Sequence, residues 1–88
     1  MVYVDQSKIK YGWMIMSHMI SDNEAELHAF AQKLGLKRSW FHRDHYDISQ
    51  SKKQEALALG AQDVTIRWAV KFMMEKRRGK RNGSQNQN

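Results

Sequence analysis

Residues 13–20 read Trp-Met-Ile-Met-Ser-His-Met-Ile, and this stretch decides the fold. Side chains alternate between the two faces of a β-strand, so Trp13, Ile15, Ser17 and Met19 face one way. Met14, Met16, His18 and Ile20 face the other way. Because both sets are mostly apolar, the pattern predicts a central strand covered on both sides, or a strand covered on one side by a partner.

The segments on either side of this strand predict a first strand and a first helix. Val2-Tyr3-Val4 is a short β-branched and aromatic run that ends at Asp5, and residues 6–12 read as a polar loop. Residues 21–24, Ser-Asp-Asn-Glu, have the spacing of a capping box that starts a helix. The helix carries apolar residues at helical spacing from Leu27 to Leu34, and Gly35 ends it.

The second half of the chain predicts two strands and two helices. Residues 37–46 have no periodicity and read as a loop that leads into a short strand near residues 46–48. Ser51 and Gln54 form a second capping box before a short helix that stops at Gly60. Residues 62–64 are a strand candidate, and Thr65 caps a last helix whose core positions are Ile66, Ala69, Val70 and Met73.

These elements predict one α+β domain over residues 1–78, in which three to four short strands pack against two to three helices. A chain of 88 residues is too short for two cores. Residues 79–88 have no apolar side chains to bury and predict a disordered, basic tail. The chain has no cysteine, which excludes disulfides and thiolate metal sites. We see no signal peptide and no apolar stretch long enough to span a bilayer, so we expect a cytoplasmic protein without a membrane partner.

The net charge of +6 is concentrated in the C-terminal quarter. Residues 1–66 carry eight basic and eight acidic side chains. The seven remaining bases, which face one acidic residue, are Arg67, Lys71, Lys76, Arg77, Arg78, Lys80 and Arg81. Such a segment attracts phosphate backbones and other anionic surfaces, so these seven are candidate nucleic-acid contacts.

Histidines and aspartates suggest a site. If the strands are neighbours, the side chains that converge are Asp5, His18, His28, His45 and Asp47. Imidazole with carboxylate suits zinc, manganese or iron. Two other interpretations stay open: hydrogen-bonded histidines without a ligand, and metal-free acid-base chemistry or anion recognition.

Aromatic residues offer two further interpretations. In residues 37–43 bases alternate with Trp40 and Phe41, which suits stacking of a base, although anchoring of the loop to the core is favoured. In the last helix, Trp68 and Phe72 fall opposite the predicted core face. This second apolar stripe predicts a homo-oligomer interface, with a stacking platform on a basic helix as the alternative. The glycines are isolated from one another, which disfavours dinucleotide and Walker-type binding.

Several short blocks, in this order and at compatible spacing, carry a family resemblance. They are Val2-Tyr3-Val4-Asp5, Gly12-Trp13-Met14, Ser17-His18-Met19, Glu26-Leu27-His28, Trp40-Phe41, His45-Tyr46-Asp47-Ile48 and Gly60-Ala61. Over residues 2–70 the chain resembles the short bacterial and bacteriophage proteins grouped as domain of unknown function 4031. The resemblance implies a small stand-alone domain without an assigned activity. It favours Asp5, His18, His28, His45, Tyr46 and Asp47 as a common site, and it places Ser17 where many relatives have cysteine.

Three functional hypotheses follow. The first is a binding module, of phage or bacterial origin, for a nucleotide or nucleic acid. Its ligand-binding residues are Asp5, His18, His28, Trp40, His45, Tyr46 and Asp47, assisted by the C-terminal bases. The second is a metal-dependent hydrolase or nuclease that uses the histidines and aspartates of the same set. The third is a phage protein that binds and inhibits a host protein through Trp68 and Phe72.

Overall fold

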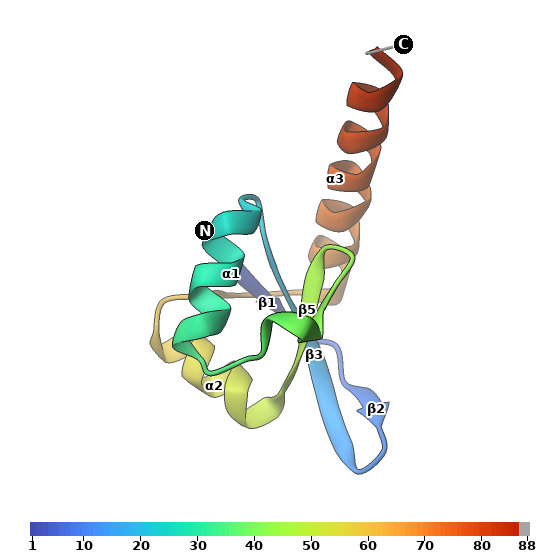
Figure 1. Ribbon diagram of the computed structural model, residues 1–88. Coiled ribbons are helices and arrows are strands. Elements are labelled where there is room, and N and C mark those ends of the chain that lie inside the picture. Colours follow the sequence, from blue (N-terminus) through green and yellow to red (C-terminus); the bar gives the residue numbers. More distant parts are fainter. Residues whose placement is uncertain (87–88) are drawn as a thin grey trace.

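A computed structural model describes the backbone of residues 1–86 and the side chains of residues 1–79 (Figure 1). The chain is a mixed α+β domain whose sheet, within the described residues, has six strands. The strands are β1 (Val2–Asp5), β2 (Ile9–Tyr11), β3 (Met14–Ser21), β4 (Phe41–His42), β5 (His45–Ser49) and β6 (Gln62–Val64). The helices are α1 (Glu24–Lys33), α2 (Gln50–Ala58) and α3 (Ile66–Asn86), with one 3-10 turn over Arg38–Trp40. The class is as predicted, and the sheet is larger.

The strand over residues 14–21 is central, as its two apolar faces predict. The sheet order is β4-β5-β3-β1-β6, and β2 also pairs with β3. β3 is antiparallel to β1, β2 and β5, whereas β1 and β6 run parallel. One strand therefore connects most of the sheet.

The two faces of the sheet are buried by different helices. Figure 1 shows α1 and α2 together on one side of the strands and α3 on the other side. The core under α1 and α2 includes Val4, Met19 and Tyr46, all at most 1% exposed. The smaller core under α3 is formed by Ile20, Ala69 and Met73, with neighbouring aromatic side chains packed against them. The α3 core lies over β1, β6 and the end of β3. The part of the same face that lies over β5, where Asp47 is exposed, is called the open face below.

Residues 9–11 form a strand, so the predicted polar loop over residues 6–12 is wrong in its second half. β2 pairs with β3 through a turn at Gly12, whose φ of 63° is the left-handed conformation that glycine tolerates. All three β2 residues are exposed. Ile9, Lys10 and Tyr11 do alternate, but three residues are too short a run to predict a strand by alternation alone.

In both α1 and α2 the N-cap residue lies two positions from the one predicted. Asn23, rather than Ser21, caps α1 by accepting from the backbone N–H of Glu26. Ser49, rather than Ser51, caps α2 by accepting from the N–H of Lys52. In each case two nearby side chains offer a suitable oxygen, and the strand before the helix decides which one is used. Strand β5 correspondingly begins at residue 45, and residues 38–42 contain a 3-10 turn and β4 where a loop is predicted.

The predicted core face of the last helix is wrong in part. Ala69 and Met73 are buried as predicted, but Ile66 and Val70 are 49% and 45% exposed. Phe72 packs against the α3 core because its ring lies 5.5 Å from that of Tyr3 on β1. The predicted cap is correct, since Thr65 accepts a hydrogen bond from the N–H of Trp68.

The backbone of helix α3 is described as far as Asn86. The predicted boundary between the domain and a disordered tail at residue 79 stays a prediction. Residues 87–88 lie outside the described residues, and so do the side chains of Lys80 and Arg81. Among the described residues, no helix has the length and apolar character needed to cross a bilayer.

Candidate metal centre

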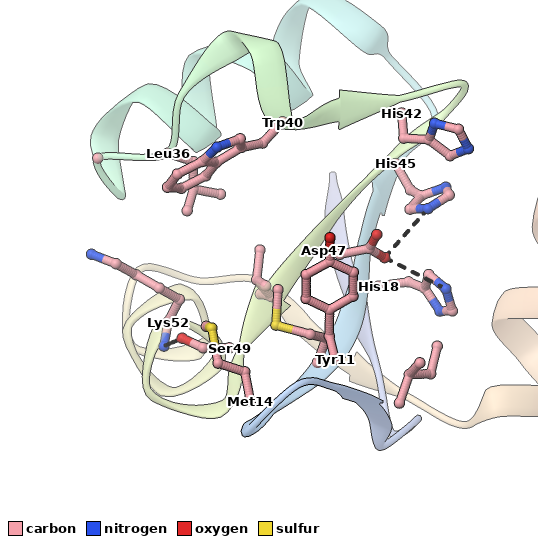
Figure 2. Close-up of a pocket in the computed structure, with 14 residues that line it drawn as sticks. Tyr11, Met14, His18, Leu36, Trp40, His42, His45, Asp47, Ser49 and Lys52 are labelled. Atoms are coloured by element: carbon pink, nitrogen blue, oxygen red, sulfur yellow. Dashed lines mark hydrogen bonds and ion pairs between the residues drawn. The ribbon is translucent and has the colours of Figure 1, made fainter.

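Strand pairing brings two histidines and one aspartate together on the open face. His18 on β3 lies directly opposite Asp47 on β5. His45 is two residues before Asp47, so both side chains leave β5 on the same face. One ligand atom from each of the three residues lies within 4.8 Å of the others. Figure 2 shows the three side chains converging, with Oδ1 of Asp47 at 3.8 Å from Nε2 of His18 and 3.4 Å from Nε2 of His45.

The other ring nitrogen of His18 is held by Asp5. Nδ1 of His18 donates to Oδ2 of Asp5 over 2.7 Å. The opposite oxygen, Oδ1, accepts from the backbone N–H groups of Ser7 and His18 and from the Ser7 hydroxyl. Asp5 is 1% exposed. An ionised carboxylate can only accept hydrogen bonds, so it keeps the proton of a neutral His18 on Nδ1. The lone pair of Nε2 is then free to bind a metal.

The ionised state of Asp5 is favoured by its neighbours. Burial raises the pKa of Asp5, but the hydrogen bonds from His18 and Ser7 outweigh burial and lower the pKa to about 2. The hydrogen bond to Asp5 raises the pKa of His18 against the opposing effect of burial. A cation at Nε2 therefore competes with a proton for His18.

His45 is held in the same way by a different carboxylate. Its Nδ1 donates to Oδ1 of Asp44 over 2.9 Å. Arg77, on α3, donates to both oxygens of Asp44, from Nε over 2.7 Å and from Nη2 over 3.2 Å. Burial raises the pKa of Asp44, and the Arg77 and His45 hydrogen bonds outweigh it and lower the pKa to about 2. Helix α3 thus reaches the cluster through one ion pair.

This arrangement fits a divalent metal. Two ligand atoms on a tetrahedral ion stand about 3.3 Å apart when each bond is about 2.0–2.1 Å. The 3.4 Å separation meets this value. The 3.8 Å separation, and that between the two histidine ligand atoms, which is at most 4.8 Å, must shorten as the side chains close around an ion. Histidine ligands in proteins usually donate their second N–H to a carboxylate or carbonyl, as both histidines do here. Imidazole and carboxylate together suit zinc, and also iron or manganese.

A pocket of about 940 Å³ adjoins the cluster. Its apolar lining consists of Ile9, Tyr11, Met14, Met16, Leu36, Trp40 and Ile48. Its polar lining consists of the three cluster residues together with His42, Ser49 and Lys52. Figure 2 shows the cluster at one end of this space, with Trp40 and Tyr11 on opposite rims. A group held at the cluster would therefore have its remaining atoms against an apolar surface.

Two of the predicted site residues lie on the other face of the sheet. Tyr46 is 1% exposed in the core under α1. Its hydroxyl lies 2.8 Å from Nδ1 of His28, whose ring also packs edge-on against Phe41. Nε2 of His28 has no hydrogen bond, although Oε2 of Glu24 lies 3.5 Å away. His28 and Tyr46 form a buried pair that does not reach the cluster.

The basic side chains of α3 have several partners. Arg77 pairs with Asp44, and Lys76 donates to the backbone carbonyl of Ser21. Arg67, Lys71 and Arg78 are exposed. Nucleic-acid binding by this helix stays a prediction.

Trp68 and Phe72, the predicted second apolar stripe of α3, form one aromatic cluster with Tyr3 of β1. Trp68 stacks on Phe72 with ring centroids 5.2 Å apart, and Tyr3 contacts both rings. Trp68 remains 41% exposed. The exposed apolar side chains of α3 are instead Ile66, Val70 and Met74, which recur every four residues away from the buried Ala69 and Met73. Self-association stays a prediction.

Two charged residues of the site were missed at the sequence level. Asp44 could have been found from the sequence, because it directly precedes His45. Residues 45 and 47 share one face of a strand, so a carboxylate next to residue 45 lies beside the predicted site. Arg77 appears in the sequence only as one of several bases. Its role depends on how α3 docks, which no local pattern reveals.

Ser17 is a buried structural residue. Its hydroxyl donates to the carbonyl of Ser7 over 2.7 Å and accepts from Nε2 of Gln50 over 2.9 Å. Ser17 is fully buried on the face opposite His18. It therefore supports the loop that carries Ser7 rather than the ligand atoms.

A comparison with family models matches residues 2–76 to a family described as "Protein of unknown function (DUF4031)". No curated protein and no solved structure matches the chain.

Proposed function

This chain belongs to the DUF4031 family, and we propose that it is a hydrolase that depends on a divalent metal ion bound by His18, His45 and Asp47. The observation that carries the proposal is the pair of carboxylates behind the histidines. Asp5 and Asp44 each fix one Nδ1, so both Nε2 atoms are directed toward the same oxygen of Asp47. Two independent carboxylate–histidine pairs that converge on a third carboxylate are typical of a metal centre.

The number of protein ligands favours catalysis over a structural role. Structural zinc sites usually have four protein ligands, whereas catalytic sites have three and keep a position for water or substrate. Three residues converge here, and they face a pocket. A bound divalent ion supplies a nucleophile by lowering the pKa of its water toward neutrality, and it polarises an ester oxygen.

The protein contributes orientation and proton transfer. Asp5 and Asp44 hold the imidazole rings in the tautomer that ligation requires. His42 lines the same pocket, and its ring lies 5.6 Å from that of His45. We assign His42 as the candidate general acid or base, because its ring lines the pocket and an imidazole nitrogen can donate or accept a proton.

Metal titration of chelator-treated protein tests the proposal. We expect calorimetry with Zn²⁺ and Mn²⁺ to give one ion per chain, and His45→Ala to abolish the binding. His28→Ala is the matched control, because it removes a partly buried imidazole from the opposite face of the sheet. This variant should bind metal as the unmodified protein does. Absence of binding, or equal loss in both variants, would overturn the metal centre.

Turnover separates the hydrolase from a binding module for a phosphate-bearing ligand. The same pocket supports both functions, since a binding module requires the cluster and the aromatic rim but no reaction. We expect metal-loaded protein to hydrolyse p-nitrophenyl phosphate, with loss of activity in His42→Ala while metal binding is kept. Tight phosphate binding without turnover would favour the binding module instead.

A further inference from the structure

We infer that the pocket takes a small ligand with a flat aromatic body and a terminal phosphate, with the phosphate at the cluster and the ring between Tyr11 and Trp40. This inference rests on the metal centre proposed above and names its substrate class. The pocket volume of about 940 Å³ is that of a small-molecule site, for which about 300–1,000 Å³ is usual.

The walls define the body of the ligand. Two aromatic rings with unburied surface stand on the rims, since Trp40 is 50% exposed and Tyr11 is 75% exposed. Lys37 lies over the indole of Trp40 at 5.8 Å from the ring centroid, which withdraws part of that ring from solvent but leaves half of the side chain uncovered. Methionine and aliphatic side chains complete the wall. Flat aromatic groups gain most from such a surface, because stacking and apolar burial act together.

The polar groups at the far end of the pocket are already engaged. The Lys52 ammonium donates to the carbonyl of Leu34 over 2.7 Å and lies 3.4 Å from a carboxylate oxygen of Glu55. Ser49 is the cap of α2, where its oxygen accepts from a backbone N–H. Few free donors remain for a hydroxyl-rich body such as a sugar. The ligand therefore makes its polar contacts at the cluster end.

The charges at the cluster make phosphate binding dependent on the metal. Asp47 and the buried Asp5 are anionic, while the charge of Asp44 is balanced by Arg77. Without a cation, these carboxylates repel a phosphate. With a divalent ion bound, the open coordination position becomes the electrophilic end of the pocket.

Calorimetry of the Zn²⁺-loaded protein tests the inference with three probes. 1-Naphthyl phosphate should bind about 10- to 100-fold more tightly than methyl phosphate, because only the naphthyl group covers the pocket wall. Adenosine 5′-monophosphate distinguishes the two sources of an aromatic body. Tighter binding of this nucleotide assigns a nucleobase, and tighter binding of 1-naphthyl phosphate assigns a carbocyclic ring.

Matched tryptophan and hairpin variants locate the ring. Trp40→Ala should weaken 1-naphthyl phosphate about tenfold, the value of one stacking contact. Tyr11→Ala should weaken it as well, and the fold should be unaffected because Tyr11 is exposed. Trp13→Ala is the control in the same hairpin, since Trp13 is 92% exposed and does not line the pocket.

The outcomes separate the two proposals. Equal affinity for naphthyl and methyl phosphate, or no effect of both Trp40→Ala and Tyr11→Ala, would overturn the substrate class while Zn²⁺ binding still stood. Equal naphthyl phosphate affinity with and without Zn²⁺ would overturn the assigned orientation. Failure to bind Zn²⁺ at all would remove the metal centre and this inference together.

Discussion

Replacing Asp5 with asparagine tests the support of the cluster without removing a ligand. Three donors, from the N–H and hydroxyl of Ser7 and the N–H of His18, converge on Oδ1 of Asp5. The amide oxygen of asparagine must stay at that position to accept them, so its NH₂ group faces Nδ1 of His18. A neutral His18 must then accept at Nδ1 and carry its proton on Nε2, where the metal would bind.

The magnitude follows from the same contacts. The pKa of Asp5 is lowered from 3.8 to about 2, which corresponds to about 2 kcal/mol of stability at neutral pH. We therefore expect Asp5→Asn to lower the free energy of unfolding by about 2 kcal/mol and still to fold. Loss of a carboxylate behind a ligating histidine weakens metal binding about 10- to 100-fold, and the changed tautomer places Asp5→Asn at the upper end of that range.

Three measurements check this prediction. Urea unfolding gives the stability, calorimetry with Zn²⁺ gives the affinity, and ¹⁵N chemical shifts of the His18 ring report which nitrogen carries the proton. Asp63→Asn is the matched control. It makes the same change on β6, the strand next to β1, where the Asp63 carboxylate lies 3.3 Å from the Lys53 ammonium. If Asp5→Asn keeps the Nδ1–H tautomer and the Zn²⁺ affinity of the unmodified protein, the assigned role of Asp5 is wrong.

Three further predictions concern the ion pair, the pH dependence and the buried hydroxyl. Arg77→Ala should weaken Zn²⁺ binding about tenfold, because Asp44 loses the partner that holds it against His45. It should cost only about 1 kcal/mol of stability, because the arginine is 40% exposed. Calorimetry checks this, with Arg78→Ala as the exposed control. Asp5 and Asp44 both have a pKa lowered to about 2, so the stability they contribute is present above pH about 4 and is lost as the pH falls toward 2. Circular dichroism of urea unfolding between pH 5 and pH 2 should show this loss, and a flat profile would refute it. Ser17→Ala should cost about 1–2 kcal/mol in thermal unfolding, because the carbonyl of Ser7 loses the Ser17 hydroxyl and the Gln50 amide keeps only its longer bond to the carbonyl of Ile15. Unchanged Zn²⁺ affinity would confirm that Ser17 lies away from the ligand atoms.

The parts of the fold that the sequence predicts correctly are those with a strong local pattern. Residues 14–20 have apolar side chains on both faces, and β3 lies between β5 and β1. The parts predicted wrongly depend on contacts between distant segments. The face of α3 that is buried is set by the ring of Tyr3, about seventy positions before Phe72, which it contacts. Val70 is left exposed.

The sequence predicts that histidines and aspartates form the candidate site, but it does not predict which of them lie together. Alternation along a strand places His45 and Asp47 on one face, and no local signal says that His18 lies opposite Asp47. His28 lies on a helix, at the edge of its apolar face, so the sequence leaves it as an equal candidate. Its position on the other face follows from the docking of α1, which is a tertiary contact.

The parallel pairing of β1 with β6 has a consequence for the order of folding. Tyr3 is the register partner of Gln62, so this pairing closes a loop over most of the domain. Closing a loop of this length costs conformational entropy before the contacts between β1 and β6 can stabilise the chain. Such non-local pairings therefore form slowly. The β2–β3 hairpin closes over a few residues and forms early. We therefore expect the strands before residue 50 to pair first, with β6 and α3 joining β1 in the rate-limiting step.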